Sequence, residues 1–257
     1  MKKKQLLKIN YTLGSYRSFV DKMIELAHTK KSSYVCVSAV HIFIEAHKDD
    51  SFAAILNNAE IVTPDGKPLA WALKFLYGIK QDRVAGMDLL PDLLSEAENQ
   101  NIPVAFYGGT EEMLNKTNEH LRKNYPKLII ASMYSPPFRP LNTEEEDSII
   151  KIFNESNARM IFVVLGCPKQ ERWMISMKDK INALMIGIGG ALPVLVGLNK
   201  RAPVWMQDSG LEWVYRLGQE PKRLFKRYAI TNSLFIYLIL KEKLSFKKYS
   251  PDEMVKE

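Results

Sequence analysis

Short apolar runs rich in β-branched residues alternate with amphipathic stretches along most of the chain. The runs expected to form strands lie at 34–38, 60–62, 102–107, 128–132, 160–164 and 183–186. Stretches with helical periodicity lie at 69–77, 88–99, 111–124, 144–155 and 169–180. Near-continuous apolar strands separated by amphipathic helices are typical of a parallel sheet that is covered on both faces. We therefore predict an α/β fold with a mostly parallel sheet and helices on both faces.

The pattern changes after residue 199, where aromatic and basic residues interleave. Pro221 stands where a first helical turn would begin, so a new helix is expected from Lys222 onward. Basic residues crowd its first turns, as in an amphipathic helix at an interface. We predict a Rossmann-like domain over residues 1–199 and a basic, aromatic helical appendage over residues 200–257.

The excess positive charge lies in the same C-terminal segment. Residues 200–248 hold 11 Lys and Arg against 4 Asp and Glu, whereas the rest of the chain holds 25 of each. The net charge of +7 therefore belongs to this segment. A neutral body with a basic end indicates an anionic partner there, which could be a membrane surface, a polyphosphate or a nucleic acid.

The composition narrows the class of protein. With 46% hydrophobic and 25% charged residues, the chain is typical of a soluble globular protein. No apolar run reaches the roughly 18 residues that a spanning helix needs, and we expect no signal peptide. Cys36 and Cys167 lie in apolar runs and cannot form a disulfide framework, which favours a reducing cytoplasm.

Two loops that follow predicted strands carry candidate polar groups. Asp65 lies in a Thr-Pro-Asp-Gly-Lys-Pro stretch, where it is either a turn and capping residue or a general base at the carboxyl edge of the sheet. Arg83 precedes a helix start and is either a surface charge or a clamp for phosphate. Spacing alone leaves both alternatives open.

Two glycine turns, Gly108-Gly109 and Gly189-Gly190, each lead from a predicted strand into a helix. Free backbone N–H groups and the helix dipole favour an anion such as a diphosphate at such a turn. Leu192 occupies the third glycine position of a dinucleotide fingerprint, so a dehydrogenase is not indicated.

The densest polar cluster follows another predicted strand, at residues 165–173. Lys169 and Gln170 begin a helix against the dipole preference, which indicates placement for a ligand. Cys167 has no activating histidine at a suitable spacing, and we expect a structural thiol. His41 lacks a metal-binding partner and the chain has no Asp-x-Asp, so we predict no metal site.

These motifs, in their order and spacing over about residues 30–230, resemble the WecG/TagA/CpsF family of bacterial glycosyltransferases (family 26). The matching stretches are PDGKPLAWAL (64–73), RVAGMDLLP (83–91), FYGGT (106–110), SPPFRPL (135–141), LGCPKQERWM (165–174) and RAPVWMQDSGLEWVYRLGQEPKRLFKRY (201–228). The resemblance implies a metal-independent, inverting transfer of a hexosamine or hexose, often N-acetylmannosamine, from a UDP-sugar to a polyprenyl-diphosphate-linked saccharide. The products would be precursors of surface polysaccharides or teichoic acids.

The resemblance also implies roles for individual residues. Asp65 matches the family's proposed base, and Arg83 and Gln170 match positions implicated in donor or transition-state contact. We assign donor binding to the glycine turns and the polar cluster, that is to Gly108, Gly109, Cys167, Pro168, Lys169, Glu171, Gly189 and Gly190. We assign the acceptor diphosphate and anionic head groups to Arg216, Lys222, Arg223 and Arg227.

The resemblance makes the C-terminal segment an appendage that binds the membrane and helps to close the active site. We expect a cytoplasmic protein, peripheral on the inner face of the bacterial plasma membrane, with no cofactor besides its donor substrate. We expect no nucleic-acid partner, although the basic segment alone would also suit one. A homo-oligomer is left open.

Three positions depart from the family pattern. Val37 and Ala39 stand where relatives have Thr and Asn, and Leu192-Pro193 replaces Phe-Asp. An acid and an amide are thus missing near the expected donor pocket. The alternative function is therefore a nucleotide-sugar-binding or scaffold homologue with weakened catalysis.

Overall fold

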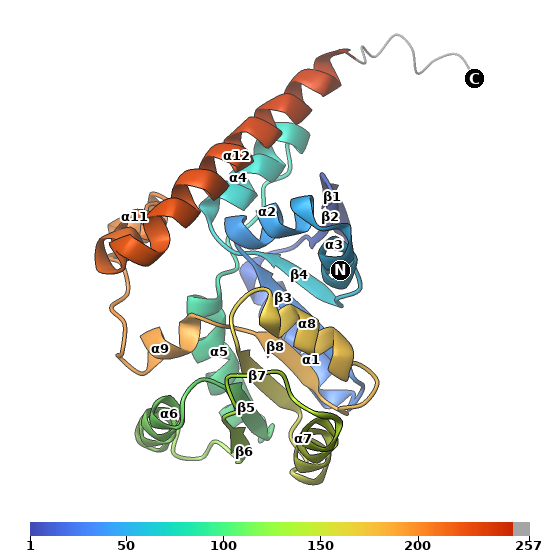
Figure 1. The fold of residues 1–257 in the computed structure, drawn as a ribbon, viewed down its shortest axis with the longest axis vertical. Helices are drawn as coiled ribbons and strands as arrows, with labels where there is room; N and C mark the ends of the chain where they lie inside the picture. The colour runs from blue at the N-terminus through green and yellow to red at the C-terminus, as the bar shows by residue number, and fades with distance from the viewer. Residues whose placement is uncertain (249–257) are drawn as a thin grey trace, which may run out of the picture.

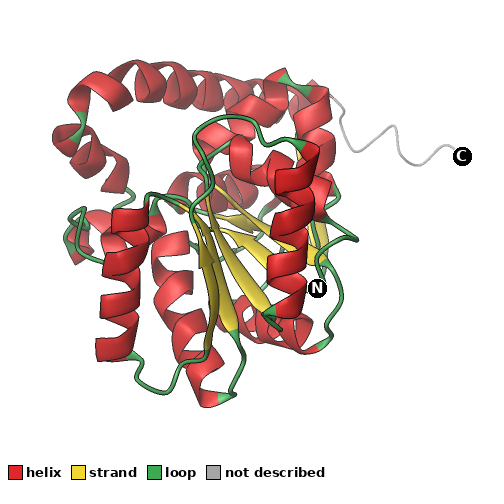
Figure 2. Cartoon of the chain, turned by 60° about the horizontal axis from the view of Figure 1, so that its bottom comes forward, coloured by secondary structure: helices red, strands yellow, loops and turns green. Residues whose placement is uncertain are grey.

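The computed structural model describes residues 1–248, apart from the side chains of Arg223 and of residues 246–248. Its centre is a six-stranded, all-parallel sheet with the strand order β4-β3-β8-β7-β5-β6 (Figures 1 and 2). The strands are β3 (Ser33–Ser38), β4 (Ile61–Pro64), β5 (Val104–Gly108), β6 (Ile130–Tyr134), β7 (Met160–Val164) and β8 (Leu184–Gly187). The predicted α/β fold with a parallel sheet is confirmed.

Two hydrophobic cores cover the two faces of the sheet. Successive strand side chains point to opposite faces, so Tyr34 and Cys36 belong to one core and Val35 and Val37 to the other. The first core contains residues from α2 (Val40–Lys48), α3 (Asp50–Asn57), α4 (Lys67–Tyr77), α7 (Thr143–Glu155) and α8 (Lys169–Met177). The second contains residues from α1 (Tyr16–His28), α5 (Gly86–Asn99), α6 (Glu111–Asn124) and α9 (Ala191–Leu195).

An N-terminal hairpin was not predicted. Its strands β1 (Lys3–Leu6) and β2 (Ile9–Thr12) pair antiparallel. Leu6, Ile9 and Tyr11 are buried, and the Thr12 hydroxyl accepts a hydrogen bond from the Val62 N–H (3.1 Å), which places the hairpin against the outer strand β4. Four-residue strands give little periodicity, and the chain turns without the Asn-Gly signal typical of a two-residue loop.

Three helices form the C-terminal segment: α10 (Val204–Asp208), α11 (Glu212–Gln219) and α12 (Pro221–Lys248). The helix start at Pro221 is confirmed. α12 packs on α2 and α4 and inserts Phe235 against Phe43 with ring centroids 5.3 Å apart, and its far end projects beyond the body (Figure 1). The division of the chain at residue 199 stays a prediction.

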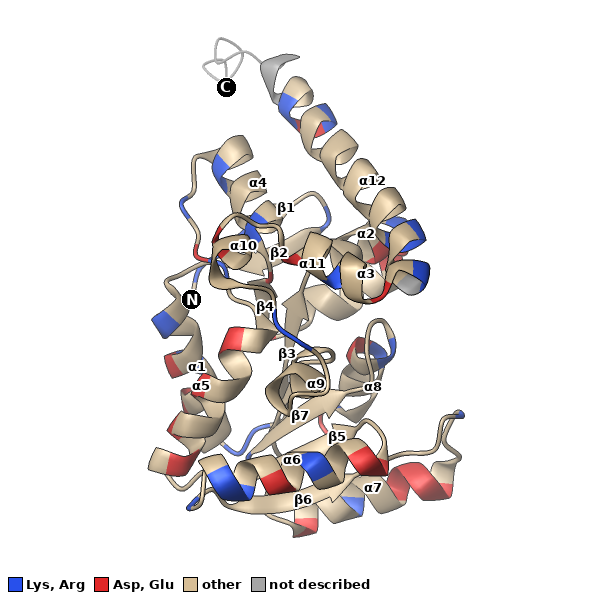
Figure 3. Cartoon of the chain, turned by 90° about the vertical axis from the view of Figure 1, so that its left-hand side faces the viewer, with Lys and Arg blue, Asp and Glu red and all other residues tan. Residues whose placement is uncertain are grey.

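The charge distribution follows the sequence. Figure 3 shows Lys and Arg gathered around the start of α12, whereas acidic and basic side chains mix on α6 and α7. Among the described residues, no helix is both long enough and apolar enough to span a membrane.

Candidate active site

A cavity of about 840 Å³ lies at the carboxyl ends of β3, β4 and β8, where the C-terminal segment covers the sheet. Its walls come from the loops after these strands and from α4, α11 and α12. In open parallel sheets, ligands bind in the crevice beyond the carboxyl ends of the strands. The position of the cavity therefore fits a catalytic site, and the residues that line it can be compared with the predicted ones.

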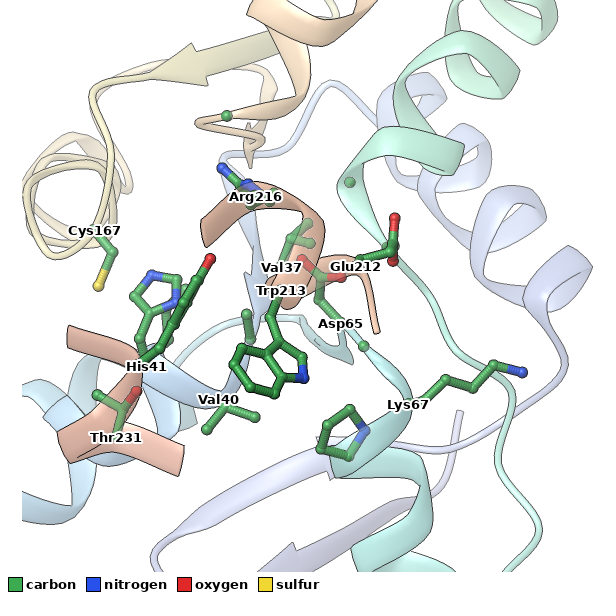
Figure 4. Close-up of a pocket in the computed structure, with 18 of the residues that line it drawn as sticks. Val37, Val40, His41, Asp65, Lys67, Cys167, Glu212, Trp213, Arg216 and Thr231 are labelled. Atoms are coloured by element: carbon green, nitrogen blue, oxygen red, sulfur yellow. The ribbon is translucent and has the colours of Figure 1, made fainter. Parts of the chain in front are cut away.

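Asp65 is the first residue after β4 and lies half-buried in the cavity (Figure 4). Its N–H donates to the Ser38 carbonyl oxygen (2.9 Å), and the chain then turns sharply at Gly66, whose φ of 98° suits glycine. Burial, reinforced by the nearby Glu212 carboxylate, raises the pKa of Asp65 to about 7, against the opposing effect of Arg83 and Arg216. A carboxylate with this pKa can accept a proton efficiently near neutrality.

Arg83 links the body to the C-terminal segment. Its guanidinium pairs with Asp88 on α5 (Nη2–Oδ2, 2.6 Å) and with Glu212 on α11, and Asp88 also pairs with Arg201. The Arg83 side chain is only 13% exposed and is absent from the described lining of the cavity. Of the two interpretations from sequence, the exposed surface charge is thus replaced by a buried ion-pair network. The expected contact with the donor stays a prediction.

Gln170 and Glu171 lie in the first turn of α8 and are both buried. The Gln170 amide Nε2 donates to Glu171 Oε1 (2.9 Å), whereas Gln170 Oε1 has no hydrogen-bond partner among the described residues. Gln170 lines the cavity and packs so closely that a Cβ at Gly189 would lie 3.2 Å from its Oε1. The free carbonyl oxygen is an acceptor available to a ligand hydroxyl or N–H group.

Cys167 lines the cavity, and burial raises the pKa of its thiol, helped by the neighbouring Glu171 carboxyl. A protonated thiol is a poor nucleophile, which agrees with the structural role expected from sequence. Pro168 and Lys169 are exposed and are not among the residues that line the cavity.

The two glycine turns differ in position. Gly189 and Gly190 line the cavity, and Gly190 lies against Arg216, whose Nη2 would be 3.0 Å from an added Cβ. Gly108 and Gly109 follow β5 and are not part of the described lining.

The basic residues of the C-terminal segment also separate. Arg216 and Arg227 line the cavity, whereas Lys222 is exposed and is not part of the lining. The side chain of Arg223 lies outside the described part of the structure. The structure thus brings together Asp65, Gln170, Cys167, Gly189, Gly190, Arg216 and Arg227.

Sequence reasoning missed two ionisable residues of the cavity. His41, interpreted as packed or solvated, lies two residues after Ala39 in the first turn of α2, where burial together with Arg227 and Arg216 lowers its pKa to about 4. Its position just after a strand was the available signal. Glu212 was quoted within the matching stretch but received no role. Within residues 1–248, no group of three or more His, Cys, Asp or Glu side chains could hold a metal ion.

An open parallel sheet with a half-buried carboxyl group and two guanidinium groups in one cavity at its carboxyl edge defines an α/β enzyme that acts on anionic substrates. Residues 4–249 match the model of the glycosyl transferase WecG/TagA/CpsF family, so the chain belongs to this family and is a glycosyltransferase.

Two curated relatives match almost the whole chain. The protein from Bacillus spizizenii is 28% identical over 250 residues, which cover 96% of this chain and 95% of the relative. The protein from Bacillus subtilis is 28% identical over 246 residues, which cover 95% and 93%. Both are named N-acetylglucosaminyldiphosphoundecaprenol N-acetyl-beta-D-mannosaminyltransferase.

Proposed function

We propose that this protein transfers a hexosamine or hexose from a UDP-sugar to a saccharide carried on a polyprenyl diphosphate, with inversion and without a metal ion. The product would serve as a precursor of a surface polysaccharide or teichoic acid. The observation that carries the proposal is the Asp65 carboxyl group, half-buried in a cavity that also holds two guanidinium groups and an apolar end. The names of the two relatives, which act on a diphosphoundecaprenol-linked sugar, support the acceptor class.

In the proposed reaction, Asp65 accepts the proton of the acceptor hydroxyl as that oxygen attacks the anomeric carbon. The bond from this carbon to the diphosphate oxygen of UDP breaks, and UDP leaves with the electron pair. Arg216 and the N–H groups of the turn at Gly189 and Gly190 would stabilise the charge on the leaving diphosphate. Attack from the face opposite to UDP inverts the anomeric configuration.

The apolar end of the cavity supports a lipid-linked acceptor. Trp71 and Phe75 on α4 face Ile236 and Leu240 on α12, and all four line the cavity although about half of each side chain is exposed. An apolar surface left open to water is typical of a binding site. The first isoprene units of the carrier would lie along this side, with the diphosphate near Arg227.

The surface of the C-terminal segment supports a peripheral membrane location. Trp205 and Phe225 are 62% and 66% exposed, and Lys222 and Lys226 are exposed beside Phe225 on the first turns of α12. Aromatic rings favour the interface, and each basic residue near an anionic surface contributes about 1 kcal/mol. We propose that this segment lies on the inner leaflet of the plasma membrane.

The Asp65→Asn variant tests the proposed base. We expect the rate of sugar transfer to a polyprenyl-diphosphate-linked acceptor to fall about 1,000-fold, because general base catalysis typically contributes 10²–10⁴-fold. The assay follows labelled sugar from a panel of UDP-sugars into the lipid fraction. Asp208→Asn, which removes an exposed carboxylate of α10 outside the cavity lining, is the matched control. Full transfer by Asp65→Asn would contradict the proposal.

A second variant tests the membrane location. Trp205→Ser combined with Phe225→Ser should weaken binding to vesicles containing phosphatidylglycerol about tenfold or more, because two rings leave the interface. Sedimentation with vesicles measures the binding, which should also fall with added salt. Phe138→Ser removes an exposed ring from the loop after β6 and is the control. Equal binding by all three proteins would exclude this surface.

A nucleotide-sugar-binding homologue with weakened catalysis is the second candidate. Ala39 and Pro193, the two positions that lack the family's amide and acid, both line the cavity. A UDP-sugar that raises the melting temperature without being turned over would favour this candidate.

A further inference from the structure

Glu212 supplies the second carboxylate of the cavity. Among the described residues that line the cavity, Asp65 and Glu212 are the two acidic ones, and they come from opposite walls, the loop after β4 and the first turn of α11. Arg216 follows one turn later on the same helix and also lines the cavity. The short helix α11 thus brings one negative and one positive group to the site of the proposed base (Figure 4).

The partner of Glu212 is the guanidinium of Arg83. Arg83 uses Nη2 for Asp88 (2.6 Å) and Nη1 for Glu212, so both ends of its planar fork are occupied. Arg83 is also close to Asp65 along the sheet edge, because the N–H of the next residue, Val84, donates to the carbonyl oxygen of Pro64 (3.1 Å). If Nη1 lost Glu212, the carboxylate of Asp65 would be the nearest remaining acidic group of the cavity.

We propose that Glu212 is a positioning residue for sugar transfer: by holding Nη1 of Arg83, it keeps this guanidinium from pairing with Asp65 and so preserves the proton affinity of the base. The inference rests on the proposed role of Asp65 and deepens it. It makes the C-terminal segment part of the acid–base chemistry, because the base is correctly set only while α11 is seated on Arg83.

The charges that face Asp65 all have to be considered. They are Glu212 and Arg216 on α11, Arg83 before α5, Asp88 on α5, Lys67 on α4, His41 on α2 and the Tyr11 hydroxyl on β2. Burial raises the pKa of Asp65 most, Glu212 raises it further, and Arg83 and Arg216 lower it. Removing the charge of Glu212 and releasing Arg83 therefore act in the same direction, and both lower the proton affinity of Asp65.

The test is a titration of the free protein, with no substrate. The carboxyl ¹³C signal of Asp65, in protein labelled at aspartate and assigned with Asp65→Asn, should have its midpoint near pH 7 in the wild type. In Glu212→Gln we expect the midpoint to fall by at least about one pH unit. Asp208→Asn, which removes a carboxylate of the same segment outside the cavity, should leave it unchanged. An unchanged midpoint in Glu212→Gln overturns the inference.

A double variant separates capture of Arg83 from simple loss of charge. In Glu212→Gln combined with Arg83→Leu, the midpoint should rise again above that of Glu212→Gln, because the released guanidinium is gone. A midpoint that stays as low as in Glu212→Gln overturns the proposed role of Arg83. Glu212→Asp, which keeps the charge, should restore most of the wild-type midpoint and serves as the test should Glu212→Gln fail to fold.

The acid limb of the transfer rate provides a second readout. A merely structural role for Glu212 would lower the rate equally at every pH, whereas the proposed role moves the acid limb to lower pH along with the titration midpoint. The two proposals fail separately. Full transfer by Asp65→Asn removes the base itself, whereas a base-dependent transfer whose limb is unmoved by Glu212→Gln removes only the role of Glu212.

Discussion

The two glycine turns of the sheet look alike in sequence and serve different ends. Gly108 follows β5 in the half of the sheet away from the cavity, and a Cβ there would lie 2.6 Å from the Val164 carbonyl oxygen of β7. Gly190 follows β8 at the cavity, and a Cβ there would meet the flexible end of Arg216. The first turn needs glycine for the contact between strands, and the second leaves room for a cation. The neighbour of a glycine, rather than the glycine itself, thus indicates an anion site.

Exchanging each glycine for alanine breaks this comparison most directly. Gly108→Ala should lower the free energy of unfolding by about 3 kcal/mol, because φ is 105° and backbone oxygen blocks the methyl group. Gly190→Ala, at a φ of −71°, should change it by less than about 0.5 kcal/mol and instead weaken the binding of UDP. Urea unfolding and a UDP titration measure the two effects. Equal loss of stability in both variants would contradict the distinction.

Removing the cation sharpens the comparison. Arg216→Ala should lower kcat/KM for transfer about 100-fold, because a guanidinium that stabilises the leaving diphosphate acts mainly in the transition state. Lys116→Ala removes a basic side chain from α6, the helix after the other glycine turn, and should leave kcat/KM nearly unchanged. Steady-state kinetics with the best UDP-sugar decides, and a similar loss in both variants would place the anion elsewhere.

The half of the sheet that carries the site should also be less stable than it could be. The pKa of Asp65 is raised on folding, so the native state binds more protons than the unfolded state between about pH 4 and pH 7. The wild type therefore loses stability as the pH rises through this window. Above pH 7, Asp65→Asn should be more stable by about 2 kcal/mol, roughly half the value for a fully enclosed carboxyl, because Asp65 keeps partial access to water.

Calorimetry at two pH values measures this difference. The melting temperature of Asp65→Asn should exceed that of the wild type by about 4–8 °C at pH 8 and by little at pH 4. A variant that is less stable at pH 8 would show that the carboxylate is stabilised by its surroundings, and the comparison between the two halves of the sheet would lose its energetic side.

The main strands and helices could be predicted because each has its own periodicity. All six predicted strands exist, and each boundary moves by two residues or less except at the end of α8, which stops at Met177 rather than at residue 180. The hairpin of β1 and β2 was missed because four-residue strands with exposed lysines carry almost no pattern.

The candidate site could be predicted in part. Asp65, Gln170 and Gly189 follow strands directly, so topology alone brings them to one edge of the sheet. The pairing of Arg83 with Glu212 joins residues 129 positions apart in sequence, and no local pattern encodes such a distance. Contacts made by the C-terminal segment therefore required the structure.

The hydrogen bond from the Val62 N–H to the Thr12 hydroxyl has a consequence for self-association. The N-terminal hairpin shields the flank of β4, and an unprotected outer strand is where two molecules can join their sheets. On the opposite flank, β6 has no further strand beside it within the described chain. If two copies joined through a continuous sheet, they would therefore meet at β6, far from the cavity, and each would keep its own entrance open.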